Sequence, residues 1–329
     1  MATNIPKFRL LRLPLLAREN VLQTMDWFDI ITISHCSKNF KLFVKSLKIK
    51  SKLLHVNISN EIVVDTGVRR WPKLLFQFEE TGNPLEAPCK LGINYGGGRT
   101  FKVITLTVRD WLNHLSEIFH CTKVALYFFQ GSEAFDVESL QNTFRGLTIH
   151  TLNIVGAGIH SPYVIKLMET FLPVEIFALH ENPFPDLVTL QKAIRDIEFN
   201  QLTFISQVPV TLPDILVLNA IDIEIWRCPL TENDLNVLFR VWKSGWNQKL
   251  SYLFMKFPRD TFSDDYETTI LDGLGAVKNE EEKYFKGRYN KHKIHVKGGY
   301  DIKKCDGTNA TILFFVYGRV VDVHFMIWK

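Results

Sequence analysis

One apolar pattern recurs along the middle of this 329-residue chain, over residues 101–257. Each copy reads apolar-x-x-apolar-x-apolar, a spacing that suits a short buried strand. The copies are Phe101/Ile104/Leu106, Cys121/Val124/Leu126, Ile149/Leu152/Ile154, Val174/Phe177/Leu179, Phe199/Leu202/Phe204, Ala220/Ile223/Ile225 and Leu250/Leu253/Met255. Between most copies, apolar residues recur three or four positions apart, as they do along an amphipathic helix. The chain is therefore expected to alternate strand and helix.

Two kinds of α/β architecture alternate in this way. A doubly wound sheet has helices on both faces, so its central strands read as continuous apolar runs. Here a polar residue often precedes the last apolar position, as at Asn153, Thr203 and Glu224. The copies are also spaced 20 to 30 residues apart, which overlaps the period of about 20–29 residues in leucine-rich repeats. We therefore favour a leucine-rich-repeat-like solenoid with one open sheet face, and the doubly wound sheet is the alternative.

The segments on either side of the repeat have different patterns. Residues 53–106 and 283–329 alternate apolar and polar positions between turn residues, which predicts antiparallel strands. Residues 6–50 read as short helices, and so short a segment cannot cover all its apolar side chains by itself. The predicted fold class is thus α/β. It has a helical N-terminal domain, 6–50, and a body, 51–329, that contains the β-rich segment 53–106, the repeat 101–257 and the C-terminal β segment 283–329.

Composition argues against several functional classes. The net charge of +4 is too dilute to indicate nucleic-acid binding by itself. The basic residues of 38–52 and 286–297 are interpreted as solvated surface. The five cysteines include no C-x-x-C pair, so neither a disulfide framework nor a zinc site is indicated. No apolar run approaches the ~20 residues needed to cross a bilayer. We expect an intracellular protein, in the cytoplasm or nucleus, with no cofactor, metal, nucleic-acid or membrane partner.

One turn is close to a dinucleotide-binding fingerprint. Gly156 and Gly158 follow a predicted strand and precede a predicted helix, and Glu181 comes 25 residues after Gly156. The position of the third glycine is Ser161, however, and a strand-turn-helix repeat places glycines in such turns by chance. We interpret the turn as structural. A nucleotide-binding α/β enzyme that uses it is the alternative function.

Two segments resemble known families. The N-terminal series Leu10-Leu11-x-Leu13-Pro14, Val21-Leu22-x-x-Met25-Asp26 and Asp29-Ile30-x-x-Ile33-Ser34-x-Cys36-Ser37-Lys38 resembles a nematode-type F-box, with Ile30 and Ile33 where Leu is usual. The series Leu230-Thr231-x-x-Asp234-Leu235-Asn236, Trp242-x-x-Gly245-x-Asn247-x-x-Leu250, Asp301-Ile302-Lys303-Lys304-x-Asp306-Gly307, Ala310-Thr311-Ile312 and Phe325-Met326-x-Trp328 resembles a type 2 F-box-associated domain. The second resemblance covers about residues 175–329.

The resemblance implies a non-catalytic substrate receptor of a Skp-Cullin-F-box ubiquitin ligase. The F-box would dock on a Skp-type adaptor of the cullin ligase, and the body would recruit an unknown protein target. An F-box scaffold that acts outside a ligase is a further alternative. The adaptor-binding residues expected from this reading are the apolar residues of the helical head, Leu13, Pro14, Val21, Leu22, Met25 and Ile30.

The repeat also predicts a target-binding face. Side chains alternate along a strand, so the neighbours of each central apolar residue point away from the helices. These neighbours are Tyr127, Asn153, His180, Thr203, Glu224, Trp226, Tyr252 and Phe254. Trp and Tyr are enriched at binding hot spots, so Trp226 and Tyr252 are the expected anchors. The alternative is that the C-terminal strands cover Trp226 and Phe254.

Overall fold

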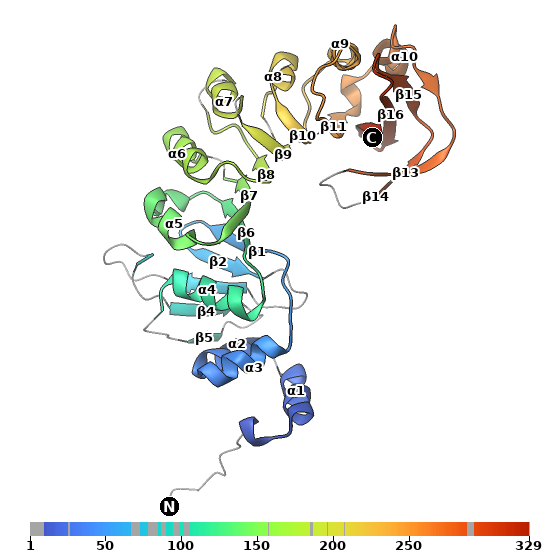
Figure 1. The fold of residues 1–329 in the computed structure, drawn as a ribbon. Coiled ribbons are helices and arrows are strands. Elements are labelled where there is room, and N and C mark those ends of the chain that lie inside the picture. The colour runs from blue at the N-terminus through green and yellow to red at the C-terminus, as the bar shows by residue number, and fades with distance from the viewer. Residues whose placement is uncertain are drawn as a thin grey trace, which may run out of the picture. The chain divides into compact units, whose positions relative to one another are not determined.

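A computed structural model gives the fold of the chain (Figure 1). It describes residues 10–25, 27–66, 73–77, 85–86, 90–94, 99–101, 106–156, 158–184, 187–195, 197–206, 208–287 and 293–328. The chain forms two compact units. The N-terminal unit comprises Met1–Asn57, Glu61–Val124 and Asn142–Thr148, and the C-terminal unit comprises Ile58–Asn60, Ala125–Gln141 and Ile149–Lys329.

The N-terminal unit begins with the helical head that the sequence predicts. Its elements are η1 (Leu10–Arg12), α1 (Leu15–Thr24), α2 (Trp27–Cys36) and α3 (Lys38–Ser46). Ser37 caps α3, because its side chain accepts a hydrogen bond from the backbone N–H of Phe40 at 3.2 Å. Helices α2 and α3 pack together and bury Ile30, Ile31 and Val44.

The rest of the N-terminal unit is a sheet and one helix. The strands are neighbours in the order β1 (Leu54–Ile58), β2 (Ile62–Asp65), β3 (Lys73–Gln77), β4 (Lys90–Asn94) and β5 (Arg99–Phe101), antiparallel from β2 onward. Helix α4 (Val108–Ile118) follows and buries Trp111 and Leu115. The first copy of the apolar pattern does not begin the parallel repeat. Its Phe101 ends the antiparallel strand β5, and its Ile104 lies outside the described residues.

The next six copies each supply a strand. These strands are β6 (Lys123–Phe128), β7 (Thr148–Ile154), β8 (Ile176–Leu179), β9 (Glu198–Phe204), β10 (Asn219–Ile225) and β11 (Tyr252–Pro258), and β7 to β11 pair in parallel. The helices between them are α5 (Val137–Phe144), α6 (Ser161–Phe171), α7 (Leu187–Ile194), α8 (Leu212–Leu216) and α9 (Glu232–Lys243). Two short 3-10 helices, η2 (Ser132–Ala134) and η3 (Arg259–Thr261), lie in the connections.

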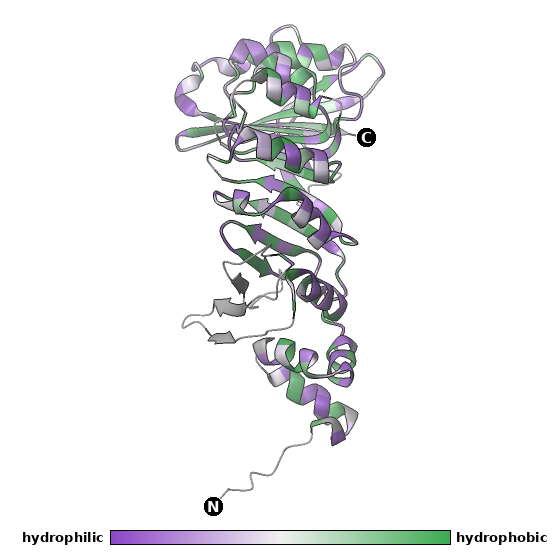
Figure 2. Ribbon diagram, turned by 90° about the vertical axis from the view of Figure 1, so that its left-hand side faces the viewer, coloured by the Kyte–Doolittle hydropathy of each residue, from purple (hydrophilic) through white to green (hydrophobic). Residues whose placement is uncertain are grey.

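The register explains the spacing of the apolar pattern. Leu152, Phe177, Leu202, Ile223 and Leu253, the central residues of five copies, pair in one row across β7 to β11 and are fully buried. Helices α6 to α9 all lie on one side of this sheet (Figure 1). Polar and apolar residues alternate along these helices (Figure 2), as expected where a helix buries one face. The opposite side of the sheet is called the helix-free face below.

Antiparallel strands complete the C-terminal unit. β11 pairs with β17 (Val320–Trp328), which pairs with β16 (Asn309–Tyr317), and β15 (Tyr300–Lys303) and β12 (Val277–Lys278) follow. Phe325 of β17 contacts Phe239 and Trp242 of α9, with ring centroids 4.9 Å apart in both pairs. The remaining elements are α10 (Tyr266–Leu271) and a separate hairpin, β13 (Glu282–Lys286) and β14 (Lys293–Lys297).

The structure therefore confirms a mixed α/β fold with N-terminal helices and antiparallel strands at both ends of the predicted body. Among the described residues, no helix is both long enough and apolar enough to span a membrane.

Candidate protein-binding surfaces

The helix-free face brings several of the predicted target-binding residues together. Asn153 pairs with Ala178, Ala178 with Thr203, Thr203 with Glu224, and Glu224 with Phe254. This row continues into the C-terminal strands, because Phe254 pairs with His324. Alternation thus correctly predicted that Asn153, Thr203, Glu224 and Phe254 share this face.

The middle of the row is a closed polar network. Gln201 donates to Oε1 of Glu224 at 3.2 Å, and Trp226 donates from its indole N–H to Oε2 of Glu224 at 3.4 Å. Burial raises the pKa of Glu224. Asn153 and Thr203 are themselves buried. Gln201, Glu224 and Trp226 thus bond to one another, and the buried Asn153 and Thr203 expose little surface to a partner.

Tyr127 and His180 are half-buried, near the C-terminal ends of β6 and β8. Burial lowers the pKa of His180. Their role in target binding stays a prediction.

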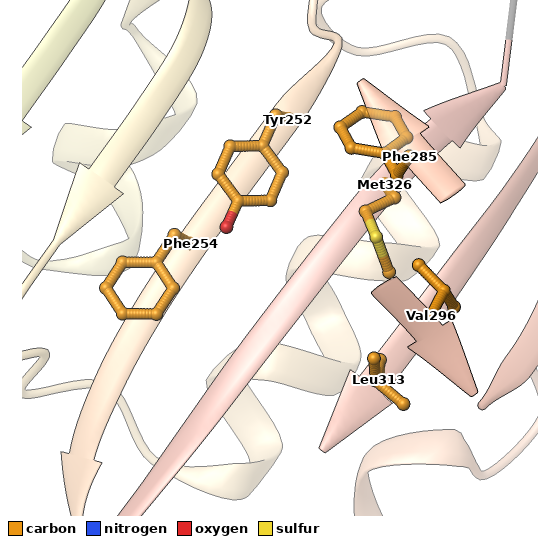
Figure 3. Packing of buried hydrophobic residues seen from close by; sticks show 6 residues of the cluster. All are labelled: Tyr252, Phe254, Phe285, Val296, Leu313 and Met326. Atoms are coloured by element: carbon orange, nitrogen blue, oxygen red, sulfur yellow. The ribbon is translucent and has the colours of Figure 1, made fainter. Parts of the chain in front are cut away.

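The β13–β14 hairpin covers the face at the Tyr252 end of β11. Phe285 of β13 and Val296 of β14 pack with Tyr252, Phe254, Leu313 and Met326 in one buried cluster (Figure 3). Tyr252 is only 3% exposed, and its hydroxyl is 2.8 Å from Nδ1 of His324. The prediction that Tyr252 is an exposed anchor is therefore wrong. Phe254 is also buried, as the alternative expected.

Trp226 is not covered in this way, because 41% of it is exposed. Its ring meets Phe254 edge to face at 5.5 Å. Phe315 and Tyr317 of β16 are exposed, and they pair with Asp322 and Val320 of β17. Those two residues pair in turn with Lys256 and Pro258 of β11, so Phe315 and Tyr317 lie on the same helix-free face. The ammonium of Lys256 lies over the rings of both Trp226 and Tyr317, at 5.0 and 5.4 Å from their centroids. Trp226, Lys256, Phe315 and Tyr317 are called the aromatic patch below.

Hydrogen bonds fix the centre of the aromatic patch. Lys256 donates to the hydroxyl of Tyr317 at 2.8 Å, and that hydroxyl donates to Oδ2 of Asp322 at 2.7 Å. The ammonium is also 3.7 Å from Oδ1 of Asp322. Burial acts to lower the pKa of Lys256, but Tyr317 and Asp322 raise it above the ordinary value. Lys256, Phe315 and Tyr317 were not predicted from the sequence, because the pairing of β16 and β17 with β11 cannot be read from periodicity.

The head carries a second apolar surface. Pro14 is exposed, and Leu13, Val21 and Met25 are half-buried. Leu16, which is not among the predicted adaptor-binding residues, is 75% exposed. Leu22 and Ile30 are fully or almost fully buried. Their expected place on an exposed docking surface is therefore wrong, because these two side chains form the core of the head instead.

The head is attached to α4 by polar contacts within the N-terminal unit. Ser34 of α2 is 2.7 Å from Nε2 of His114, and Lys41 of α3 forms a 2.9 Å ion pair with Glu117. His120 is 3.1 Å from the carbonyl of Lys45. Burial, together with the nearby Lys41 and His35, lowers the pKa of His114 to about 4. Lys41 and Lys45 of the basic helix face thus lie close to Glu117.

Comparison with known families identifies both parts of the chain. Residues 10–52 match the F-box domain, and residues 192–255 match the F-box associated family. The chain contains an F-box segment followed by an F-box-associated segment. It is 20% identical over 310 residues to the F-box associated domain-containing protein sdz-33 of Caenorhabditis elegans, an alignment that covers 93% of this chain and 94% of that protein. No solved structure matches the chain. The resemblance read from the sequence is confirmed.

The F-box match covers the head, and the F-box-associated match covers part of the C-terminal unit. The F-box match contains η1 and α1 to α3. The F-box-associated match contains β9, α8, β10, α9 and the first part of β11, and so includes Trp226. The domain limits 6–50 and about 175–329 stay predictions.

The glycine turn of this F-box protein has a structural explanation. The backbone N–H of Gly156 donates to the carbonyl of Phe128 at 3.2 Å, and a Cβ at Gly156 would overlap the backbone of Phe129 and Gln130. Gly158 has a φ of +81°, which favours glycine. The N–H of His160, just before α6, already donates to the carboxylate of Glu133 at 2.7 Å. Two backbone donors that a phosphate could use here, those of Gly156 and His160, are therefore bonded to the protein.

Proposed function

We propose that this F-box protein is a substrate receptor of a Skp-Cullin-F-box ubiquitin ligase. The observation that carries the proposal is the F-box match on a head that exposes apolar side chains. F-box domains generally bind Skp-type adaptors in cullin ligases. The chain would perform no covalent chemistry itself. It would hold a target lysine near the charged ubiquitin-conjugating enzyme, so that transfer becomes effectively intramolecular.

The adaptor surface would be the exposed side of the head. Leu13, Pro14, Val21 and Met25 supply it, together with Leu16. Leu22 and Ile30 would act from the core of the head by holding α1 and α2 in place. Burying apolar side chains of this kind against the adaptor stabilises the complex by about 25 cal/mol for each Å² removed from water.

The target surface would be the helix-free face of the C-terminal unit. We infer that its strand-helix repeat is leucine-rich-repeat-like, which is supported by the single row of central apolar residues and the helices on one side. Within this face the aromatic patch has the exposed Trp and Tyr typical of hot spots. Asn153, Thr203, Glu224 and Phe254 would support the patch, and Tyr127 and His180 would extend it along the face.

The contacts between the head and α4 would orient the bound adaptor relative to the N-terminal unit. Ser34, Lys41 and the carbonyl of Lys45 all engage α4 or the residue just after it. Such contacts would hold the head in one geometry better than a flexible linker.

Co-purification with a Skp-type adaptor tests the proposal. The full chain, co-expressed with the adaptor, should elute with it from a sizing column. The double variant Leu13→Ala with Pro14→Ala should lose the adaptor and keep its melting temperature. The matched control is Val188→Ala, an exposed apolar residue on α7, which should retain the adaptor. Unchanged co-elution of the double variant would refute the assignment of the head.

The two alternatives predict different results. An F-box scaffold that works outside a ligase would bind the adaptor without cullin. The nucleotide-binding enzyme is not favoured, since both family matches and the bonded Gly156 turn argue for other roles. Reproducible protection from heat by NAD or ATP at near-micromolar concentration would revive it.

A further inference from the structure

Two exposed arginines lie close in sequence to the rings of the aromatic patch. The exposed Arg227 directly follows Trp226, and the exposed Arg319 lies in the turn between Tyr317 and Val320. Backbone bonds hold both arginine segments beside β11. The N–H of Cys228 donates to the carbonyl of Lys256, and the N–H of Arg259 donates to the carbonyl of Arg319, each at 2.9 Å.

The acidic groups on the same face are bonded to neighbouring side chains of the protein. Glu224 accepts hydrogen bonds from Gln201 and Trp226, and its pKa is raised by burial. Asp322 is buried, accepts from Tyr317 and lies beside Lys256. Farther along, in the loop after η3, Asp264 pairs with Arg259 at 3.2 Å. Exposed Asp260 lies in η3 itself, whereas the exposed Arg227 is the residue after Trp226 and the exposed Arg319 is two residues after Tyr317. The exposed charged residues nearest in sequence to Trp226 and Tyr317 are therefore arginines.

The apolar part of the patch consists of three exposed aromatic rings. Trp226 and Phe315 are each about two-fifths exposed, and Tyr317 is half exposed. Lys256 does not block this surface with a free charge, because its ammonium is bonded to Tyr317 and paired with Asp322. A ligand would gain apolar contact at the rings and ionic contact at the edges.

We propose that the aromatic patch binds a segment of the target protein that combines a large apolar side chain with neighbouring Asp or Glu residues. The apolar side chain would lie against Trp226, Phe315 and Tyr317. The carboxylates would pair with Arg227 and Arg319, whose planar guanidinium groups suit bidentate contact. This inference rests on the proposed receptor function, and it specifies the chemical class of the target segment.

Selection from a phage-displayed library of random peptides tests the inference directly. The full chain should enrich peptides in which aromatic or large aliphatic residues stand beside Asp or Glu. Selected peptides, made synthetically, should bind the variant Trp226→Ala at least about tenfold more weakly. The charge-reversed variant Arg227→Glu with Arg319→Glu should no longer select acidic peptides and should favour basic ones instead.

Two control variants lie outside the patch. Tyr284→Ala removes an exposed aromatic side chain of β13, and Arg195→Glu reverses an exposed charge after α7. Both should bind the selected peptides as the unchanged protein does, and the melting temperatures of all variants should agree. The inference is overturned if the selected peptides carry no excess of acidic residues, if Trp226→Ala binds them equally, or if charge reversal leaves the selection unchanged.

The test separates this inference from the receptor function. Adaptor co-purification is measured on the same protein and depends on the head, not on the patch. If the adaptor binds while the library yields no acidic, apolar peptides, the target class is wrong and the receptor function stands. If the peptides are selected but the adaptor does not bind, the patch is a peptide-binding site and the ligase assignment fails.

Discussion

The ammonium group of Lys256 lies 5.0 Å from the ring centroid of Trp226 and forms the central contact of the aromatic patch. Lys256 belongs to β11, the strand at which the parallel repeat meets the antiparallel C-terminal strands. Its contact with Trp226, just after β10, and its hydrogen bond to Tyr317 of β16 link these two segments. An exposed Trp held in this way keeps one orientation, so less side-chain entropy is lost on binding than for a free side chain.

Trp226→Ala should impair target binding, whereas Phe254→Ala should impair stability. Trp226→Ala removes a largely exposed ring and should leave the melting temperature nearly unchanged while target binding is lost. Phe254→Ala removes a buried ring and should lower the free energy of unfolding by about 3–5 kcal/mol. Thermal melting of both variants, together with binding of the peptides described above, checks the pair. A large fall in the melting temperature of Trp226→Ala would show that Trp226 is a core residue, and we would then look for target contacts in the turns at the strand ends.

The two faces of the β13–β14 hairpin should differ in the same way. Phe285 points into the cluster with Tyr252, whereas Tyr284, the preceding residue, is exposed and stacks on His295. Phe285→Ala should destabilise the C-terminal unit by about 3 kcal/mol or more. Tyr284→Ala is the matched control and should cost less than about 1 kcal/mol. Chemical denaturation measures both, and equal effects would contradict the covering role of the hairpin.

Acidification below pH 6.5 should destabilise the protein through two histidines. Burial lowers the pKa values of His114 and His324 to about 4. The unfolded chain binds a proton at each His below about pH 6.5, but the folded chain does so only near pH 4. The unfolded state therefore takes up more protons between these values, and the free energy of unfolding falls as the pH is lowered from 6.5 to 4. Each His can contribute at most about 3 kcal/mol to this fall.

Variants at the two histidines check that assignment. His114→Gln and His324→Gln should each reduce the dependence of the unfolding free energy on pH between 6.5 and 4, even if both lower stability at neutral pH. Val188→Ala, at an exposed position of α7 without an ionisable group, is the control and should leave the dependence unchanged. An unaltered slope in both test variants would show that other groups cause it.

The glycine turn should tolerate no side chain. Gly156→Ala would place Cβ against the backbone of Phe129 and Gln130, and Gly158→Ala would put a Cβ at a positive φ. We expect the second change to cost about 1–2 kcal/mol and the first to cost more. Gly146→Ala is a useful comparison, since Gly146 has a positive φ but no neighbouring atom within 4 Å of the added Cβ. A thermal-shift series would contradict the structural reading if nucleotides stabilised the unchanged protein.

The parts of the fold that sequence predicted well are those set by local periodicity. Leu202 and Ile223 lie in one register row because each strand presents the same apolar spacing to the helices. Ser37 and Thr231 begin their helices as side-chain caps, which depend on a few consecutive residues. The F-box and F-box-associated segments were found because their residues follow a fixed order along the chain.

The errors come from contacts between distant segments. Tyr252 has the alternation of an exposed residue, but a hairpin about 30 residues later packs over it. Leu22 and Ile30 are as apolar as Leu16, and only the packing of the helices decides which of them is buried. Lys256 and Tyr317 meet because β16 and β17 add to the edge of the repeat. Such long-range pairings leave no periodic signal in either segment.

Affinity purification followed by quantitative mass spectrometry tests the central claim most directly. The unchanged protein, Trp226→Ala, and the double variant Leu13→Ala with Pro14→Ala would be purified from the same cells in parallel. The account predicts that the double variant loses the Skp-type adaptor and cullin while retaining the target proteins. It predicts that Trp226→Ala retains adaptor and cullin and loses those targets. Loss of the same partners from both variants, or retention of adaptor and cullin by the double variant, would contradict it.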